Sequence, residues 1–184
     1  ARADRPFLMS LIISDLDGVC ADFEGGMVDA LGPPDNPRTR REYSLRSRWP
    51  GSGKEIQRLS CDPQFYAGLT PIPYAAAAVR RLRHLGHHLI AMTARPWGAG
   101  NPVGTPMDVA TGQWLTRHAF PFHECALVDF REKPRRIAAL SPDWVIDDAP
   151  HHLEAMKNLR LNVVAFDQTW NRACLVSRLW TWHE

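Results

Sequence analysis

The sequence lacks any uncharged apolar run that approaches the roughly 20 residues a membrane-spanning helix requires. It also lacks a CxxC pair, because 41, 64 and 49 residues separate its four cysteines, Cys20, Cys61, Cys125 and Cys174. Such wide spacing favours reduced, mostly buried thiols over a disulfide framework. No small-residue cleavage segment follows the apolar stretch at 7–14. We therefore expect a soluble, cytoplasmic protein with no membrane partner.

Internal repeats and low-complexity tracts are absent from the 184 residues, of which 45% are apolar and 23% are charged. This composition excludes intrinsic disorder and collagen-like sequence. The length suits one well-buried domain, or one domain that carries a sizeable insertion.

Positive charge is concentrated in one segment. The net charge of the chain is only +2, but residues 38–58 hold seven basic and two acidic side chains, a net of +5, which leaves −3 for the rest. A local cationic surface suits an anionic ligand. A solvated, arginine-rich loop explains the same pattern equally well.

Short apolar runs alternate with helical patterns along most of the chain. The patterns predict strands at 7–14, 88–93, 126–129, 144–147 and 162–166, and helices at 73–85, 108–118, 134–140 and 151–159. Gly86 directly follows the first of these helices, as is typical of a helix C-terminus. Such alternation predicts an α/β fold, a doubly wound parallel sheet with helices on both faces.

One segment interrupts this alternation. About 50 residues separate the first strand from the helix that begins at Pro73, far more than an ordinary strand-to-helix connection needs. The segment contains the proline-rich GPPDNP at 32–37 and WPGSG at 49–53. We predict a small, mostly helical cap over residues 25–70, inserted after the first strand of a Rossmann-like core formed by residues 1–24 and 71–184.

Ligands bind beyond the carboxyl ends of the strands in doubly wound sheets. Asp15 and Asp17 are two residues apart, so in an extended chain their side chains leave the same side. Gly18 then permits a sharp turn that would lift Asp17 clear of the sheet. The polar residues at or after the ends of the first four predicted strands are, in chain order, Asp15 and Asp17, Thr93, Lys133, and Asp147 and Asp148.

These residue types together point to phosphate chemistry at a metal. Carboxylates that converge on one rim raise one another's pKa values and favour a bound cation, and oxygen ligands with room for water and phosphate suit Mg²⁺. The Thr93 hydroxyl and the Lys133 ammonium would complete an anion site facing that metal. A lone DxD, or one threonine at a strand end, is usually structural. The ordered set instead favours a carboxylate nucleophile, a second carboxylate for acid–base catalysis, a metal and a phosphate cradle.

Four segments resemble the motifs of the haloacid dehalogenase-like (HAD) hydrolase superfamily: DLDGV at 15–19, LIAMT ending in Thr93, EKP around Lys133, and VIDD at 145–148. The resemblance covers the whole predicted core, about 130 residues. It implies that Asp15 attacks phosphorus to form an aspartyl-phosphate, and that Asp17 protonates the leaving oxygen and then activates water. An aspartate at position 17 also indicates a phosphatase or phosphomutase within this superfamily.

The resemblance implies the remaining roles as well. Thr93, Ala94 and Lys133 would contact the phosphoryl group, and Lys133 would offset the negative charge near the nucleophile. The ligands of Mg²⁺ would be the Asp15 carboxylate, the Asp17 backbone carbonyl, Asp148 and, directly or through water, Asp147.

A narrower resemblance is to the 5′(3′)-deoxyribonucleotidase branch of this superfamily. DGVCADF at 17–23 is similar to the opening of that branch, and weaker similarities lie at 65–73, 111–115 and 165–172. They imply a nucleoside monophosphate as substrate, a small molecule rather than a nucleic acid. A phosphatase for a sugar phosphate or a nucleic-acid 3′-phosphate is one alternative. A noncatalytic HAD scaffold is another, which the complete catalytic set disfavours.

Aromatic residues are candidates for stacking on a base, although ordinary packing explains each one singly. These candidates are Trp97 after the second motif and, in or near the cap, Phe23, Trp49, Phe65 and Tyr66. We expect His151 and His152 at the surface, because adjacent side chains point apart. The C-terminal tryptophans at 170, 180 and 182 are expected in a helix packed on the core, or in the contact of a homodimer.

Overall fold

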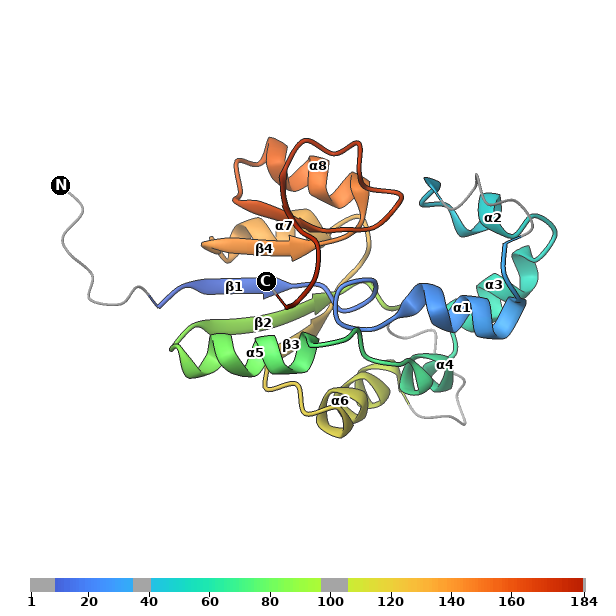
Figure 1. Cartoon of the computed structure of the whole chain (residues 1–184), viewed down its shortest axis with the longest axis horizontal. Helices are drawn as coiled ribbons and strands as arrows, with labels where there is room; N and C mark the ends of the chain where they lie inside the picture. Colours follow the sequence, from blue (N-terminus) through green and yellow to red (C-terminus); the bar gives the residue numbers. More distant parts are fainter. Residues whose placement is uncertain (1–8, 35–40, 97–105, 184) are drawn as a thin grey trace.

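Six short strands form one sheet in which every neighbouring pair is parallel, in the order β3-β2-β1-β4-β5-β6 (Figure 1). The computed structural model describes residues 9–34, 41–96 and 106–183. Five of the six positions of β2 are buried, since both faces of this strand are covered, and this accounts for its nearly continuous apolar run. The predicted doubly wound α/β fold is confirmed. The strands are β1 Leu11–Ser14, β2 His88–Thr93, β3 Glu124–Leu127, β4 Trp144–Asp147, β5 Val163–Phe166 and β6 Ser177–Leu179.

Alternate strand residues bury themselves on opposite faces of the sheet. One face packs Ile12 and Leu89 against α5 (Ala75–His84) and α6 (Met107–Arg117). The other packs Ile13 and Ile90 against α7 (Lys133–Ala139) and α8 (Pro150–Asn158). The two layers of helices lie on either side of the strands in Figure 1. This arrangement leaves the carboxyl ends of the strands as an open rim.

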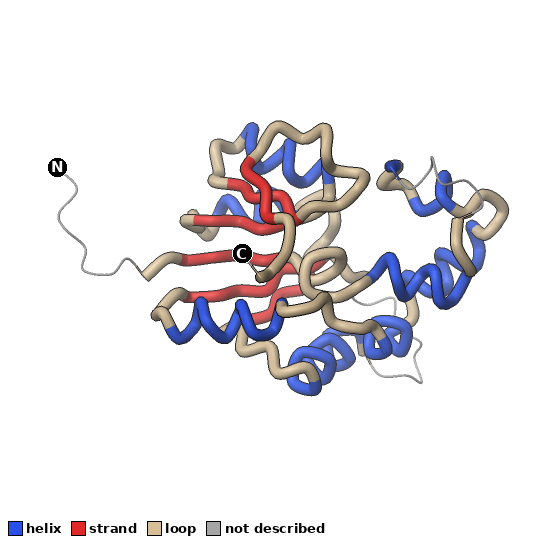
Figure 2. Tube along the Cα trace, in the orientation of Figure 1, coloured by secondary structure: helices blue, strands red, loops and turns tan. Residues whose placement is uncertain are grey.

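Four more helices, between β1 and α5, lie on the side toward which the strands point (Figure 2). They are α1 Phe23–Leu31, α2 Leu45–Arg48, α3 Gly53–Ser60 and α4 Pro63–Gly68. Met27, Trp49, Ile56 and Leu59 form a small apolar core between them. The last helix, α4, packs on α6, where the Trp114 indole donates to the Leu69 carbonyl at 2.7 Å. The cap boundaries at 25 and 70 stay a prediction, but a helical insertion is present.

The C-terminal segment differs from the expected helix. Residues 177–179 pair with β5 as a sixth strand, which the sequence did not indicate because this segment has no apolar run. Trp182 is buried, and its indole donates to the Val19 carbonyl at 2.6 Å. Trp180 is 56% exposed. The helical prediction for these tryptophans is therefore wrong, whereas packing of one of them on the core is correct.

The expectation of mostly buried cysteines is correct for two of the four. All four cysteines are free thiols; Cys20 and Cys174 are buried, Cys61 is half-buried and Cys125 is exposed. Across the described ranges, no helix is long and apolar enough to cross a bilayer.

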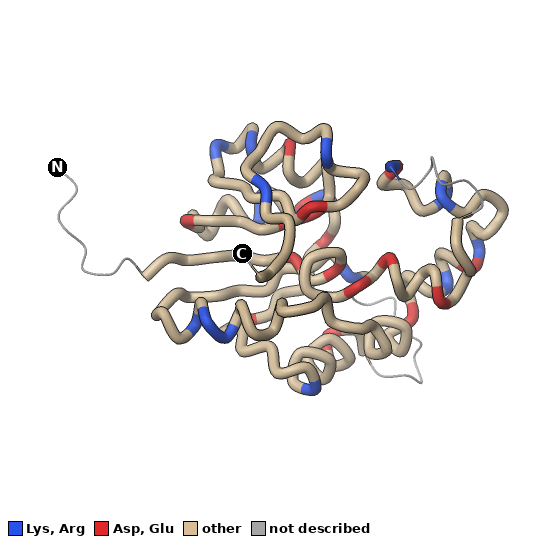
Figure 3. Tube along the Cα trace, viewed as in Figure 1, with Lys and Arg blue, Asp and Glu red and all other residues tan. Residues whose placement is uncertain are grey.

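Ion pairs reduce the positive charge that the basic segment 38–58 exposes. Figure 3 shows where basic and acidic residues lie along the trace. Arg48 is buried and forms an ion pair with Glu24, and Arg58 pairs with both Glu55 and Asp62 on the surface. Two of the arginines counted in the segment, at 38 and 40, lie outside the described residues. Glu24 and Asp62, which lie outside residues 38–58, therefore offset part of the net charge of +5.

Candidate active site

A cavity of about 460 Å³ lies between the rim of the sheet and the inserted helices. From the core, its lining includes Asp15, Asp17, Thr93, Ala94, Asp148 and Trp170. From the segment 23–68, it includes Phe23, Tyr43, Arg48 and Tyr66. The volume is within the range of about 300–1,000 Å³ that is common for small-molecule sites. The predicted catalytic edge of the sheet is thus also the floor of this pocket.

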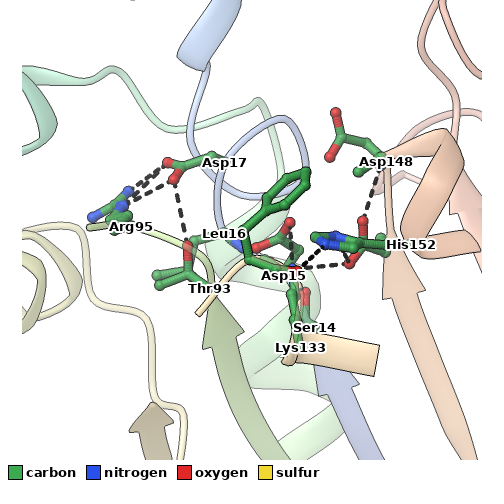
Figure 4. A network of polar contacts seen from close by, with 12 residues as sticks. Ser14, Asp15, Leu16, Asp17, Thr93, Arg95, Lys133, Asp148 and His152 are labelled. Atoms are coloured by element: carbon green, nitrogen blue, oxygen red, sulfur yellow. Dashed lines mark hydrogen bonds and ion pairs between the residues drawn. The ribbon is translucent and has the colours of Figure 1, made fainter. Parts of the chain in front are cut away.

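Asp15 lies directly after β1 with both carboxylate oxygens held. Oδ1 accepts a hydrogen bond from the Leu16 backbone N–H at 2.7 Å, and Oδ2 lies 2.7 Å from Lys133 Nζ (Figure 4). Burial is the main cause that raises the pKa of Asp15 from 3.8 to about 6, and the Lys133 ammonium opposes that rise. The result is a carboxylate with one fixed orientation at the floor of the pocket.

Lys133, at the start of α7, is fully buried between two carboxylates. Its Nζ lies 2.9 Å from Oδ2 of Asp147, in addition to its contact with Asp15. Burial lowers its pKa, but the two negative charges outweigh burial and hold the pKa above the ordinary value. Lys133 therefore remains an ammonium and supplies positive charge beneath the nucleophile candidate.

Asp148 closes the other side of the floor. Its Oδ2 accepts a hydrogen bond from the Trp170 indole at 3.2 Å, and its backbone carbonyl accepts one from Asn171 Nδ2 at 2.9 Å. Burial, followed by the negative charges of Asp147 and Asp15, raises the pKa of Asp148 well above its usual range. Gly18 has a φ of +77°, and a Cβ there would lie 2.4 Å from Asp148 Oδ2. The glycine therefore permits both the predicted turn and the approach of this carboxylate.

Three of the four predicted metal-binding residues form one buried cluster. Asp15, Asp147 and Asp148 each offer an oxygen, and these oxygens lie within 4.8 Å of one another. Lys133 balances only one of the three negative charges. A divalent cation with oxygen ligands fits this excess of two negative charges in a buried place.

The Asp17 carboxylate is not part of that cluster. It points to the opposite side of the site, where Arg95 holds it with Nη2–Oδ1 at 2.7 Å and Nε–Oδ2 at 3.0 Å (Figure 4). The Thr93 hydroxyl donates to Asp17 Oδ2 at 3.4 Å. The four carboxylates expected on one rim are thus divided into a group of three and one ion-paired residue. The predicted metal contact of Asp17, through its backbone carbonyl, stays a prediction.

The predicted aromatic contacts fall into three groups. Phe23 and Tyr66 line the pocket. Trp49 is 5% exposed, belongs to the core between the inserted helices and donates from its indole to the Gly32 carbonyl at 2.8 Å. Phe65 packs on Phe23 with ring centroids 5.7 Å apart and is not among the lining residues. Trp97 lies outside the described residues.

The sequence patterns did not indicate three residues at or beside the pocket. Arg95 follows Thr93 by two residues and is buried next to Asp17. Trp170, in a C-terminal loop, and Tyr43, which precedes α2, line the cavity. His152, expected at the surface, is buried: its Nε2 lies 2.9 Å from the Phe130 carbonyl and its Nδ1 3.7 Å from Asp147 Oδ2. The expectation was wrong because the two rings do not point apart: their centroids lie 4.3 Å from each other, and both rings pack on Phe130. His152 is therefore buried, and His151 is half-buried. The only sequence signal for Arg95 was its place in the tripeptide TAR at 93–95, which begins at the last residue of the second predicted strand.

The sheet is parallel, Asp15 after β1 is paired with the buried Lys133, and two aspartates, Asp147 and Asp148, lie at the end of β4. These features together define a hydrolase of the HAD class. Residues 9–184 match the family described as 5′ nucleotidase, deoxy (pyrimidine), cytosolic type C, and the chain belongs to that family. The sequence resemblance to HAD phosphatases near the nucleotidases is confirmed.

Relatives agree with this assignment. A protein of Oceanobacillus iheyensis named "Putative nucleotidase" is 27% identical over 136 residues, which are 72% of this chain and 68% of the relative. A "Putative 5'(3')-deoxyribonucleotidase" of Chlorobaculum tepidum is 25% identical over 186 residues, 95% of this chain and 88% of the relative. Among solved structures, a haloacid dehalogenase-like hydrolase of Streptococcus pneumoniae has a TM-score of 0.58 at 14% identity, with 90% of this chain and 88% of that chain covered. The last comparison bears on the fold alone.

Proposed function

We propose that the protein is a Mg²⁺-dependent phosphomonoesterase that dephosphorylates nucleoside monophosphates through an aspartyl-phosphate on Asp15. The observation that carries this proposal is the buried Asp15–Lys133 contact at the floor of the pocket, with Asp17 close by on a separate ion pair. It joins a fixed carboxylate nucleophile to a permanent positive charge, in a place shielded from bulk water.

The first half-reaction forms a bond from a carboxylate oxygen of Asp15 to phosphorus, while the bond between phosphorus and the ester oxygen breaks. Asp17 gives its proton to the departing oxygen, which leaves as the nucleoside hydroxyl. Thr93 Oγ1, the backbone after it at Ala94 and Lys133 Nζ would hold the phosphoryl oxygens as charge redistributes.

In the second half-reaction Asp17 takes a proton from a water molecule whose oxygen attacks phosphorus. The bond between phosphorus and the Asp15 oxygen breaks, so the free carboxylate and inorganic phosphate are restored. Mg²⁺ would be held by Asp15, Asp147 and Asp148, and it would neutralise the phosphoryl charge that these carboxylates otherwise repel.

The substrate class is supported by the shape and lining of the pocket. Besides the acidic residues, the lining includes Phe23, Tyr43 and Tyr66, whose rings can contact a flat base. Both similar proteins described above carry nucleotidase names. A cytoplasmic location and a homodimer remain predictions.

The proposal is tested by phosphate release from the purified protein with Mg²⁺. The substrates are nucleoside monophosphates, sugar phosphates and a 3′-phosphorylated oligonucleotide, and Asp15→Asn is the control, because an amide cannot form the acyl-phosphate. We expect release from mononucleotides that stops with a chelator and is absent in Asp15→Asn. Release from none of the three, by folded protein, contradicts the activity. Release from the sugar phosphates or the oligonucleotide alone contradicts the substrate class.

A further inference from the structure

Arg95 is a buried arginine that the proposed reaction does not use. It lies just after β2, is 1% exposed and makes three close contacts with the Asp17 carboxylate, Nε–Oδ1 at 3.2 Å, Nε–Oδ2 at 3.0 Å and Nη2–Oδ1 at 2.7 Å. Two nitrogens facing two oxygens fix the plane of the carboxylate as well as its position. The orientation of Asp17 is therefore determined by a residue 78 positions away in the chain.

The guanidinium is itself fixed by two other parts of the fold. Its Nη1 donates to Thr111 Oγ1 of α6 at 3.2 Å, and Thr111 donates in turn to the Met107 carbonyl at 2.7 Å. The guanidinium carbon lies 4.6 Å from the centroid of the Tyr66 ring of α4 and 5.7 Å from that of Trp114 of α6. Arg95 thus has little freedom, and Tyr66, which lines the pocket, restricts it from the side of the inserted helices.

A buried ion pair of this kind is weak evidence for stability. Removing two charges from water costs several kcal/mol per ion, roughly what their attraction returns. The Asp17 side chain is 21% exposed and opens into the cavity, so an unpaired carboxylate there could be solvated. Neutral side chains of similar shape in place of Arg95 and Asp17 would pack equally well. Packing therefore does not require an arginine here, whereas a fixed direction of the Asp17 carboxylate does.

The direction matters because three other carboxylates lie nearby. Asp15, Asp147 and Asp148 form the cluster that suits a cation, and Asp17 is separated from it by its attachment to Arg95 (Figure 4). A flexible Asp17 could turn its side chain toward the cluster and compete there for the cation. Held by Arg95, it stays on the side of the pocket next to Thr93 and Tyr66.

We propose that Arg95 is a positioning residue that holds the Asp17 carboxylate beside the ester oxygen of the substrate and keeps it out of the three-carboxylate cluster. The inference rests on the proposed function for the role of Asp17 as acid and base. Tyr66 and Thr111 hold the guanidinium in turn, so the position of Asp17 depends on the packing of α4 on α6.

The test compares two substrates with different leaving groups, the best mononucleotide and p-nitrophenyl phosphate, in wild type, Arg95→Gln and Arg95→Lys. The alkyl ester needs a proton on its leaving oxygen, whereas p-nitrophenolate leaves without one. The rates compared are those of the first turnover, because Asp17 acts as base on both substrates alike in the later hydrolysis of the aspartyl-phosphate. We expect Arg95→Gln to lose about 100-fold in the first-turnover rate on the mononucleotide, near the lower end of the contribution of a general acid. It should lose less than about fivefold on the aryl ester, and Arg95→Lys should recover part of the loss. Arg58→Gln, which removes an exposed ion pair and is not among the residues that line the cavity, is the control and should change neither rate.

A purely structural role for Arg95 gives a different pattern. In that case both substrates lose equally, the melting temperature falls in parallel and Arg95→Lys restores nothing; this result overturns the proposal. Thr111→Val covers the case in which Arg95→Gln does not fold, because it removes one support of the guanidinium and keeps the volume. We expect it to lose about three- to tenfold on the mononucleotide alone, and equal losses on both substrates again overturn the proposal.

A crystal structure of Arg95→Gln, or of Thr111→Val if Arg95→Gln does not fold, separates this inference from the proposed function. If wild type releases no phosphate from any ester, the proposed function fails, but the position of the Asp17 carboxylate is still measurable. A carboxylate that moves toward Asp15 and Asp148 supports positioning by Arg95. A carboxylate that keeps its place overturns it.

Discussion

The Trp170 indole donates a hydrogen bond from Nε1 to Oδ2 of Asp148, with 3.2 Å between the two atoms. On its other side, the Trp170 ring lies 4.9 Å from the guanidinium carbon of Arg48, a residue of the inserted helix α2. Asp148 is one of the three clustered carboxylates. Trp170 therefore links the candidate metal site to the segment that covers the pocket.

Replacing Trp170 by phenylalanine should weaken metal binding without abolishing it. The change removes the only proton donor of the ring and leaves its flat shape, so Asp148 loses one support of its orientation. Loss of such an outer partner typically costs about 10–100-fold in metal affinity. We expect the Mg²⁺ concentration for half-maximal activity to rise about tenfold, with little change in the maximal rate at saturating Mg²⁺.

Trp180→Phe is the matched control, because that indole is 56% exposed and lies outside the cavity lining. Equal Mg²⁺ requirements in Trp170→Phe and wild type would show that the hydrogen bond does not orient Asp148.

Asp148→Asn should stabilise the metal-free protein and abolish its response to Mg²⁺. Burial and the charges of Asp147 and Asp15 oppose ionisation of this carboxyl group in the metal-free fold, which is why its pKa is raised. A neutral amide removes that cost and can still accept from Trp170. In a chain of this length about 1 kcal/mol raises the melting temperature by roughly 2–4 °C. Thermal unfolding with EDTA and with Mg²⁺ measures both effects; a lower melting temperature in EDTA contradicts the electrostatic argument.

The catalytic edge could be predicted because each motif ends a strand of the same parallel sheet. Register then determines proximity: Ser14 of β1 pairs with Ala91 of β2 and with Ile146 of β4, so the residues that follow them meet at the rim. A strand end is recognisable from a local apolar run followed by polar residues. This is why Asp15, Thr93 and the Asp147–Asp148 pair were found from the sequence.

Contacts between distant segments were not predictable in the same way. The ion pair of Arg95 with Asp17 and the hydrogen bond from Trp170 to Asp148 depend on how loops fold back over the rim. The periodicity of a local segment does not indicate how a loop folds. Trp49 was misjudged for a related reason: the insertion is large enough to bury a tryptophan of its own, and composition alone does not show which aromatic rings face the cavity. The sequence also does not show which arginines of segment 38–58 are paired, as Arg48 is with Glu24.

The pH dependence of stability should reveal Asp15. Its pKa is raised from 3.8 to about 6, so the folded state keeps this proton to higher pH than the unfolded state does. The stabilisation is full below about pH 4 and is lost as the pH rises through about 6. We expect the free energy of unfolding of metal-free wild type, relative to Asp15→Asn, to fall between pH 4 and 6 and to level off above pH 7. Urea unfolding of both proteins in EDTA measures it, and a difference that does not change with pH contradicts the raised pKa.

The aromatic residues of the insertion should separate into a stacking residue and a packing residue. Tyr43 is 39% exposed, lines the cavity and contacts Trp170 edge-on with ring centroids 6.4 Å apart, so its ring can lie against a base. Stacking of one base on one aromatic ring contributes about 1–3 kcal/mol, and Tyr43→Ala should therefore raise KM for a mononucleotide about tenfold. KM for deoxyribose 5-phosphate, which has the same phosphoester but no base, should change less than twofold.

Trp49→Ala instead removes a 5% exposed ring from the core of the insertion, which should cost about 3–5 kcal/mol of stability and impair both substrates alike. Steady-state kinetics on the two substrates, with melting temperatures for both variants, distinguish the roles. Equal losses on both substrates in Tyr43→Ala would assign this ring to packing, and a selective loss in Trp49→Ala would return base recognition to the residue first expected to provide it.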